Sequence, residues 1–531
     1  MPSVLSSPRA AQFTLAEVLE ATGGQLYQLI PINSPQHSGP IHTDTRTLQA
    51  GDWFLALVGE HFDGHQFLET AAAAVVSDNG AMGGLIVSKA EVLNHLTLSK
   101  DVPIVIVPDT LEAYLALGRY HRCRYPDTTV IGITGSSGKT TTKELLLAAL
   151  SPLCAVQATA LNHNNEVGVA QTLCSLQAAT DVLIVEMGMR GLGQIEPLSK
   201  AACPNIVSIL NIGPAHIGLL GSLEAIAQAK SEIVIGLTAT PSRLCSDPTV
   251  VIPANSSQLW DIAADRPSQI LQQALNTGAI NPQVVTTQLS SASHISHAIQ
   301  GTTFDYQGTR IELSIPGQHL VENTLLVLAI GQALGFSPSQ LAAGLAAYCP
   351  VQGRWEPTWF HASPTSTSPS CLIQDAYNAN PASMLASLQT LEGIVPPNSR
   401  CLLILAGMKE LGHMTHHYHQ ALGEWLAASR LAKQSDIVLL GEEMDATREA
   451  LVAAGYSPTA HLITGAPCDE VLHTLTNDCQ ESLTKNDSPC WVLLKGSRFY
   501  RLDTLGAKLL EGKQLVKTPS PGLEAQEATC S

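Results

Sequence analysis

A short loop rich in glycine and hydroxyl groups, with one lysine, carries the most specific chemistry in the sequence. It reads Thr134-Gly135-Ser136-Ser137-Gly138-Lys139-Thr140-Thr141, between a β-branched apolar stretch and a run of good helix formers. Glycines let backbone N–H groups approach a polyphosphate, the helix N-terminus favours negative charge, Lys139 adds a point charge and Thr140 offers a hydroxyl to Mg²⁺. The strict pattern G-x-x-x-x-G-K-[ST] is not met, because its first position falls on Ile133. Strand, loop and helix in this order predict a phosphate-binding loop, with a chance match in a glycine-rich linker as the alternative.

Further polar side chains come where neighbouring elements of the same region end. Glu186 closes one apolar strand-like stretch, His216 follows the next, and Lys230 ends a helix-like segment. The carboxyl ends of parallel strands share one edge of a sheet, where α/β proteins bind ligands, so Glu186 is placed to hold Mg²⁺. Asn164 and Asn165 stand in a loop that faces the same edge. The alternative for Glu186 is a solvated glutamate at the end of a strand. From the residues alone, His216 is expected to be structural and Lys230 to be a surface lysine.

The elements that must position these groups form successive α/β units. The first opens with a helix that Thr14 caps, with Glu17 three residues on and Gly23 past its end. Polar residues in 42–67 surround the ends of an apolar strand, which indicates a ligand loop or, equally well, a polar turn. This unit ends near a predicted linker at 124–127.

The remainder continues the alternation of strands and helices. Residues 238–300 are weakly patterned and predict loops with one strand at 250–252, and a hairpin is predicted around 307–309. From about 350 the pattern is that of a doubly wound sheet. Four histidines within 413–419 have no carboxylate or thiolate nearby to complete a ligand set, so no metal site is predicted there.

Composition limits the class of protein. The 531 residues are 45% hydrophobic and 14% charged, enough for large cores and roughly three or four domains of about 150 residues. The net charge of −17 argues against nucleic acid or an anionic membrane as the main partner. The 12 cysteines contain no C-x-x-C pair, which indicates reduced thiols. With no export signal and no apolar run of about 18 residues, a cytoplasmic protein without stable membrane insertion is predicted.

A series of ordered motifs gives the sequence a family resemblance. They are T-G-S-S-G-K-T-T at 134–141, E-M-G at 186–188, G-P-A-H at 213–216, A-K-S-E at 229–232, P-G-Q-H at 316–319, G-R-W-E at 353–356, D-A-Y-N-A-N-P-A-S-M at 375–384 and K-G-S-R at 495–498. From Phe13 to about Leu505 the sequence resembles the Mur ligases, the ATP-dependent amide ligases of peptidoglycan precursor synthesis. The resemblance is strongest to the member that adds D-alanyl-D-alanine to UDP-N-acetylmuramoyl-tripeptide, since Y-N-A-N-P-A-S-M and the D-T-R and D-G-H motifs are present and D-N-P-R is not.

The resemblance implies an α/β fold of three domains. A central P-loop-type, mostly parallel sheet would be flanked by an N-terminal α/β domain and a C-terminal Rossmann-like domain. The boundaries expected are 1–126 for the UDP substrate, 127–349 for ATP and 350–517 for the ligase domain. The tail at 518–531, rich in Pro, Ser and Glu, is expected to be disordered.

The resemblance also implies roles that the residues alone leave open. Lys230 matches the lysine that the family carbamylates, which would turn a desolvated amine into an anionic oxygen ligand. With Glu186 and His216 it would hold one Mg²⁺, while Thr140 and Glu186 would serve a second. Together with Lys139 these make up the implied catalytic set.

Substrates and their contacts are implied in the same way. The implied ATP contacts are the loop 134–141 with Asn323, Arg354 and Asp375. The implied substrate contacts are Thr45 and Arg46 for the UDP end, with Asn164, Asn165, Tyr377, Asn378 and Asn380. UDP-N-acetylmuramoyl-tripeptide would be activated as an acyl phosphate, and the amine of D-alanyl-D-alanine, held by the third domain, would displace phosphate. The chain would act as a monomer.

One position departs from the family, and two other classes share part of the pattern. The usual L-G-D-M-x-E-L-G reads Leu-Ala-Gly-Met-Lys-Glu-Leu-Gly at 405–412, so Gly407 replaces an aspartate with Lys409 nearby. A folate polyglutamate ligase shares the central and C-terminal architecture, but that family begins close to its P-loop, whereas an α/β unit precedes this one. A P-loop protein that uses nucleotide as a switch is the alternative from a different class. The combination of Glu186, His216 and Lys230 favours catalysis.

Overall fold

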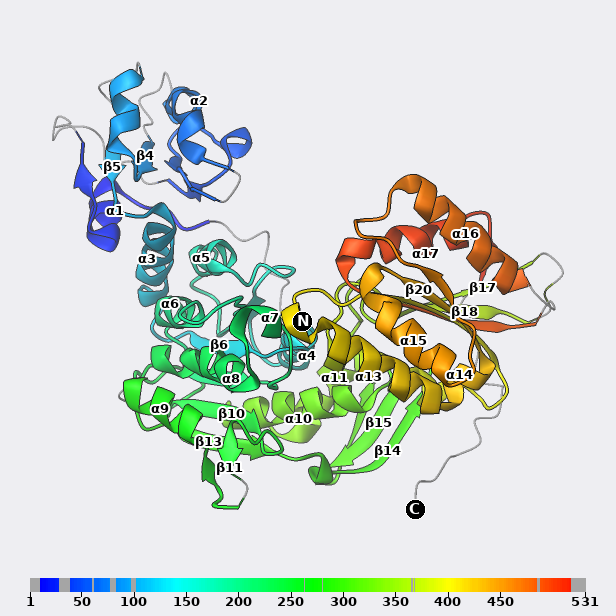
Figure 1. Ribbon diagram of the computed structural model, residues 1–531. Helices are drawn as coiled ribbons and strands as arrows, with labels where there is room; N and C mark the ends of the chain where they lie inside the picture. The colour runs from blue at the N-terminus through cyan, green and yellow to red at the C-terminus, as the bar shows by residue number, and fades with distance from the viewer. Residues whose placement is uncertain are drawn as a thin grey trace.

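Three α/β units, each with its own sheet, follow one another along the chain (Figure 1). The computed structural model describes residues 10–27, 39–59, 62–76, 83–96, 102–261, 263–278, 280–363, 366, 368–484 and 488–516. The tail predicted at 518–531 lies outside these residues. Within them, no helix has the length and apolar character needed to cross a membrane.

The central sheet positions the phosphate-binding loop, and it is parallel throughout with strand order β13-β10-β9-β6-β8-β7. Its strands are β6 (Thr129–Thr134), β7 (Val156–Ala158), β8 (Val182–Glu186), β9 (Ile206–Ile209), β10 (Thr249–Pro253) and β13 (Gln283–Thr287). Every residue of β6, β8 and β9 is buried, as expected of strands covered on both faces. Ile133 lies opposite Glu186 in the sheet, so the loop and the carboxylate emerge at the same edge, as predicted.

Helices cover both faces of this sheet. They are α4 (Lys139–Leu150), α5 (Glu166–Cys174), α6 (Ile195–Ala202), α7 (Ile217–Leu220), α8 (Leu223–Ser231), α9 (Gln269–Gly278), α10 (Gln318–Ala333) and α11 (Pro338–Ala346). Among them α10 is almost wholly buried, with eleven buried side chains between Leu320 and Gly331. It therefore forms the core of the unit and carries Asn323 to the loop.

The strand predicted at 250–252 is confirmed as β10, but the prediction of loops over the rest of 238–300 is wrong. The region also contains α9, β13 and β14 (Ala292–Ala298), with two short strands, β11 (Trp260–Asp261) and β12 (Arg266–Pro267). The strands β13 and β14 gave no clear signal because none of their residues is fully buried, whereas the helical apolar period of α9, with Leu271 and Leu275 buried, was overlooked. The predicted hairpin is confirmed, with β15 (Gly301–Tyr306) antiparallel to β16 (Thr309–Leu313).

The first unit has the sheet order β1-β5-β4-β3-β2. Its elements are α1 (Leu15–Thr22), β1 (Gln25–Leu26), β2 (Ile41–His42), β3 (Trp53–Leu55), α2 (Leu68–Ala74), β4 (Gly84–Val87), β5 (Ile104–Ile106) and α3 (Thr110–Cys123). The predicted capping box of α1 is present, and Gly23 follows it at φ 62°.

Helix α3 ties the first unit to the central one. The ring of His121 lies 2.9 Å from the carbonyl of Leu176, and Arg122 donates to the carbonyls of Ala202 and Thr128 at 3.3 and 3.1 Å. Figure 1 shows α3 running from the first unit down to α5 and α6. The first unit is thus joined to the central unit by a partly buried helix.

The third unit has the sheet order β21-β20-β19-β22-β18-β17-β23, parallel from β21 to β18. Its strands are β17 (Glu356–Phe360), β18 (Ser370–Asp375), β19 (Arg400–Ala406), β20 (Ser435–Leu440), β21 (Thr459–His461), β22 (Cys490–Lys495) and β23 (Leu515–Val516). Its helices are α12 (Pro381–Ile394), α13 (Thr415–Ala428), α14 (Arg430–Gln434), α15 (Asp445–Ala453), α16 (Asp469–Thr484) and α17 (Leu502–Leu510). The order is that of a Rossmann-like sheet with antiparallel strands at one edge, which confirms the predicted fold class.

One member of the histidine cluster in the third unit, His419, has a structural role. His419 is buried, its Nε2 accepts from the backbone N–H of Met408 at 3.0 Å, and its Nδ1 lies 2.7 Å from the carbonyl of Thr415. Burial lowers the pKa of His419. The neutral ring fixes the loop that follows β19, because both ring nitrogens are engaged by backbone.

Two helical glycines give a paired stability prediction. A Cβ at Gly344 in α11 would lie 2.2 Å from the carbonyl oxygen of Ala148 in α4, whereas a Cβ at Gly393 in α12 would meet nothing within 4 Å. Gly344→Ala is expected to lower stability by about 1–3 kcal/mol through overpacking. Gly393→Ala is expected to leave it unchanged or raise it by up to about 1 kcal/mol. Urea unfolding measures both, and the reverse order would contradict the packing of α11 on α4.

Candidate active site

The phosphate-binding loop depends on a glycine where the loop becomes a helix. Gly138 precedes α4 with φ 78°, and a Cβ there would lie 2.9 Å from Nδ2 of Asn323 in α10. Glycine is therefore required both for the left-handed backbone and for the close approach of α10. The Nζ of Lys139 donates to the carbonyl of Gly135 at 2.8 Å, and desolvation lowers the pKa of Lys139.

The same loop is fixed to the segment that follows β9. The hydroxyl of Ser136 donates to the carbonyl of Gly213 and accepts from its N–H, each at 2.9 Å. The side chain of Asn211 accepts from the N–H of Ser137 at 3.0 Å and donates to its carbonyl at 3.1 Å. These reciprocal pairs hold the loop in position, so little ordering remains to be done when phosphate binds.

Glu186 carries the buried negative charge of the site. Only 1% of the residue is exposed, and its Oε1 accepts from Asn164 at 2.8 Å and from the Thr140 hydroxyl at 3.3 Å. Its Oε2 is buried without a hydrogen-bond partner among the described residues. An unpaired buried carboxylate oxygen is costly, and Mg²⁺ prefers oxygen ligands. The residues present therefore fit a cation between Glu186 and Thr140.

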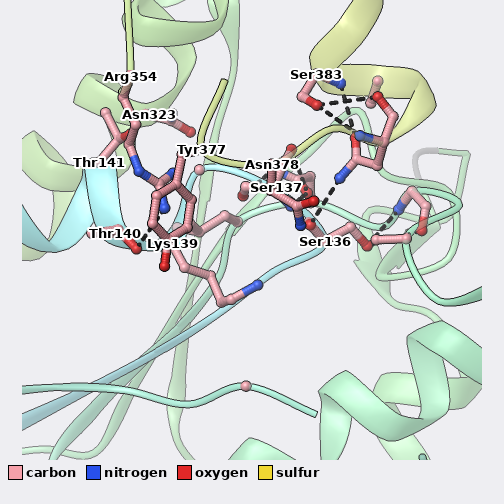
Figure 2. Close-up of a pocket in the computed structure, with 18 of the residues that line it drawn as sticks. Ser136, Ser137, Lys139, Thr140, Thr141, Asn323, Arg354, Tyr377, Asn378 and Ser383 are labelled. Atoms are coloured by element: carbon pink, nitrogen blue, oxygen red, sulfur yellow. Dashed lines mark hydrogen bonds between the residues drawn. The ribbon is translucent and has the colours of Figure 1, made fainter. Parts of the chain in front are cut away.

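The third unit reaches into this loop. Arg354 donates to the Thr140 hydroxyl at 3.1 Å, and its guanidinium lies 4.5 Å from the ring centroid of Tyr377. The side-chain amide of Asn380 donates to the carbonyl of Ser136 at 3.3 Å. Figure 2 shows Arg354 and Tyr377 together beside Thr140. A second cation thus lies next to the phosphate-binding loop, supplied by a different domain.

Behind Tyr377, the third unit adds a charged pair to the cleft. The Nζ of Lys495 lies 3.0 Å from Asp375 Oδ2 and also donates to the carbonyl of Asn378 at 3.0 Å. Ser387 donates to the same oxygen of Asp375. Asp375, expected to contact ATP, is therefore held by neighbours that leave its other oxygen for a ligand.

Lys230 and His216 are the remaining predicted members of the site. Lys230 is 1% exposed, and no hydrogen bond or ion pair joins its ammonium to the part of the chain that the structure describes. Burial, with Lys139 nearby, places the pKa of Lys230 well below its ordinary value. The Nδ1 of His216 lies 2.5 Å from Oε2 of Glu410, a residue of the third unit. A lysine that is readily deprotonated is chemically suited to form a carbamate.

A cleft of about 2000 Å³ connects these groups and extends to Val58 and Phe62 of the first unit. The predicted residues that line it are Ser136, Ser137, Gly138, Lys139, Thr140, Thr141, Asn164, Asn165, Glu186, His216, Asn323, Arg354, Asp375, Tyr377, Asn378 and Asn380. Thr134, Gly135 and Lys230 lie beneath this surface, since all three are buried and none is among the lining residues.

Two predicted substrate residues are not brought to the cleft. Thr45 and Arg46 form a one-turn helix outside its lining, and the exposed Arg46 pairs with Asp44 at 2.6 Å. Asn165 does line the cleft, but its side chain caps α5 by accepting from Gly168 at 3.0 Å. The substrate roles of these residues stay predictions, and only Asn165 has a position in favour of its role.

The departure at Gly407 has a physical explanation. A Cβ at this position would lie 2.8 Å from Oε2 of Glu443, whose carboxylate is paired with Lys409 and accepts from the Tyr500 hydroxyl. An aspartate at 407 would bring a second carboxylate against the first. The carboxylate of Glu443 therefore already occupies the space beside position 407, which favours glycine there.

Among the cleft residues that were not assigned from the sequence, four make contacts described here or have a lowered pKa. They are Asn211, His319, Glu410 and Lys495. His319 and Lys495 belong to the motifs P-G-Q-H and K-G-S-R, and Asn211 precedes G-P-A-H, so the motifs could have indicated them. Glu410 belongs to the stretch at 405–412 that was compared with L-G-D-M-x-E-L-G, so this motif could have indicated it, although its partner is remote in sequence.

His319 gives a pH-dependent prediction. Burial lowers its pKa from 6.5 to about 4, with Lys495 acting in the same direction and Asp375 against it. Between pH 6.5 and pH 4, His319 takes up a proton in the unfolded chain but stays neutral in the folded one. The contribution of neutral His319 to the free energy of unfolding is therefore complete above pH 6.5 and is lost as the pH falls toward 4. The urea midpoint of the wild type should therefore fall more between pH 7.5 and pH 5 than that of His319→Gln. Equal falls would contradict the lowered pKa.

Comparisons with known proteins agree with this geometry. The family model of the Mur ligase middle domain matches residues 133–331, and that of the Mur ligase glutamate ligase domain matches residues 362–498. A Synechocystis protein named UDP-N-acetylmuramoyl-tripeptide–D-alanyl-D-alanine ligase is 36% identical over 72% of this chain and 75% of its own length. A Bacillus subtilis protein of the same name is 31% identical over 89% and 93%. The crystal structure of MurF from Acinetobacter baumannii matches with a TM-score of 0.76 at 29% identity, covering 94% of this chain and 99% of that one. The chain therefore belongs to the Mur ligase family.

Proposed function

We propose that this chain is an ATP-dependent ligase that adds D-alanyl-D-alanine to UDP-N-acetylmuramoyl-tripeptide in peptidoglycan precursor synthesis. The observation that carries the proposal is the meeting of Thr140, Glu186 and Arg354 at the phosphate-binding loop. It combines a phosphate cradle, a carboxylate with a free oxygen and a cation from a second domain. The relatives described above are named for this activity, and they match most of this chain.

The reaction needs ATP because a carboxylate is a poor electrophile. The terminal carboxylate of the tripeptide attacks the γ-phosphate of ATP, which gives an acyl phosphate and ADP. The amine of D-alanyl-D-alanine then attacks the acyl carbon and phosphate leaves, carrying the electrons of the broken C–O bond. Lys139 and Arg354 lie where they offset the negative charge that gathers on the transferred phosphoryl group.

Four residues are proposed to hold the metal ions. Glu186 and Thr140 would bind one Mg²⁺, and Glu186, His216 and carbamylated Lys230 a second. When bound, Mg²⁺ neutralises phosphate charge and orients the phosphoryl group. The unpartnered Oε2 of Glu186 and the desolvated Lys230 support this assignment.

The three units are proposed to divide the substrates between them. Residues 1–126 would hold the UDP end, 127–349 ATP, and 350–517 the dipeptide. The cleft supports this division, since it runs from Phe62 past the phosphate-binding loop to Arg498 within one chain. Such a cleft limits water, which would hydrolyse an acyl phosphate. A monomer in the cytoplasm, where ATP and UDP-linked precursors are available, is the proposed working form.

Phosphate release tests the proposal directly. Purified protein should release phosphate from ATP only when UDP-N-acetylmuramoyl-tripeptide and D-alanyl-D-alanine are both present, and mass spectrometry should show the pentapeptide product. Lys139→Ala should reduce the rate to background, because the cation at the phosphates is lost. Release with diaminopimelate or glutamate in place of the dipeptide would assign a sister ligase or a folate-type ligase. Nucleotide binding without any acceptor-dependent release would assign a switch.

The carbamate is tested by chemical rescue. Lys230→Ala should lose most activity, and short carboxylic acids should restore part of it by replacing the carbamate oxygens. Lys200→Ala is the matched control, because Lys200 is half exposed and, among the residues that the structure describes, forms an ion pair with Glu196 alone, on the same helix. Full activity of Lys230→Ala without added acid would exclude the carbamate.

A further inference from the structure

We propose that Glu410 is a positioning residue that orients His216 and thereby couples docking of the third domain to assembly of the metal site. The inference rests on the proposed function, in which His216 is a metal ligand. The contact spans the central and third domains, and its two partners are 23% and 35% exposed.

The loop that presents Glu410 is rigid within the third domain. After β19, the N–H of Gly407 donates to the carbonyl of Leu440 at 3.0 Å, and that of Met408 donates to the buried His419 at 3.0 Å. The next residue, Lys409, is paired with Glu443. Glu410 itself has φ 63°, a left-handed conformation that costs a non-glycine residue free energy and persists only where its surroundings impose it.

Across the domain interface, Glu410 makes three contacts with the central domain. Its Oε2 lies 2.5 Å from Nδ1 of His216, its Oε1 lies 3.3 Å from Arg190, and its backbone carbonyl accepts from the N–H of Gly218 at 3.0 Å. His216 also has φ 63°. Both ends of the contact thus hold strained backbone, which is typical of functional sites.

A pair of glycines permits this approach. A Cβ at Gly218 would lie 2.4 Å from the backbone nitrogen of Gly412, and a Cβ at Gly412 would lie 2.7 Å from the Cα of Gly218. Gly218 does not have positive φ, so the backbone of α7 can accommodate an alanine at this position. The three nearest atoms that its Cβ would meet all belong to Leu411 and Gly412 of the third domain. The interface is built for direct contact between the two backbones.

The chemical consequence concerns the other ring nitrogen of His216. A carboxylate at Nδ1 fixes the tautomer and orientation of an imidazole and leaves Nε2 as the metal donor, and loss of such a partner typically weakens metal binding by about 10–100-fold. Glu410 reaches His216 only when the third domain is docked. Metal binding and docking therefore strengthen each other, because coupling between two equilibria is reciprocal.

The test titrates Mn²⁺ into the full-length chain with a non-hydrolysable ATP analogue and follows free Mn²⁺ by electron paramagnetic resonance. Glu410→Ala should weaken Mn²⁺ binding by about 10-fold or more, and Glu410→Gln, which keeps an acceptor oxygen, should recover most of the affinity. Glu424→Ala is the matched control, since Glu424 is exposed on α13 and its carboxylate accepts one side-chain hydrogen bond within the described part of the chain, from Gln420. Wild-type affinity in Glu410→Ala would overturn the proposal.

Two further variants separate positioning from general damage. Gly218→Ala should weaken Mn²⁺ binding and increase the radius of gyration in small-angle X-ray scattering, although neither side chain of the pair is changed. In a His216→Ala background, Glu410→Ala should cause no additional loss, whereas a further 10-fold loss would show that Glu410 does not act through His216. These readings do not require turnover. If the protein fails the phosphate-release assay but shows these changes in Mn²⁺ binding, the proposed function is refuted. The coupling between domain docking and metal binding is then still supported.

Discussion

A buried carboxylate that its own neighbours do not satisfy is the constraint around which the site is organised. Glu186 ends a fully buried strand, and only one of its oxygens has partners. Lys139 and Arg354 lie beside it at the phosphate-binding loop, and the nearby Lys230 is held away from water. In so dry an environment unbalanced charge is expensive. The charges of the site are therefore balanced only when its ligands are bound, because the anionic phosphates and the metal cations together offset the charges of the protein.

The same constraint explains why the domains meet where they do. Arg354 and Asn380 enter the phosphate-binding loop from the third unit, and Glu410 enters at His216. None of these contacts exists in an isolated central domain. Catalysis by a ligase of this kind requires that an acyl phosphate forms only where the amine can reach it and water cannot. A site whose cations are divided between two domains meets that requirement, because it is assembled by docking.

The loop after β19 is shaped by a carboxylate from outside it. Glu443 brings its carboxylate against Gly407, while Lys409 and Tyr500 hold it there. A side chain larger than that of glycine at 407 would meet this carboxylate. Next to it, Glu410 keeps its contact with the central domain, since the backbone of the loop is fixed independently by His419.

The sequence by itself determined what depends on near neighbours. The phosphate-binding loop, the capped helix after Thr14, the hairpin near 307 and the carboxylate at the end of β8 are local patterns, and each was found where predicted. Within 238–300 the strand β10 was predicted and β14 was missed because its residues are mostly exposed, whereas α9 was overlooked although its apolar residues recur with a helical period. Contacts such as Arg354 with Thr140 and Asn380 with Ser136 join residues 214 and 244 positions apart. Motifs could name these residues as participants, but only the tertiary structure decided that Glu410 meets His216 and that Thr45 and Arg46 lie away from the cleft. Contacts between docked domains produce no periodic pattern of residues along the sequence, so such a pattern could not predict them.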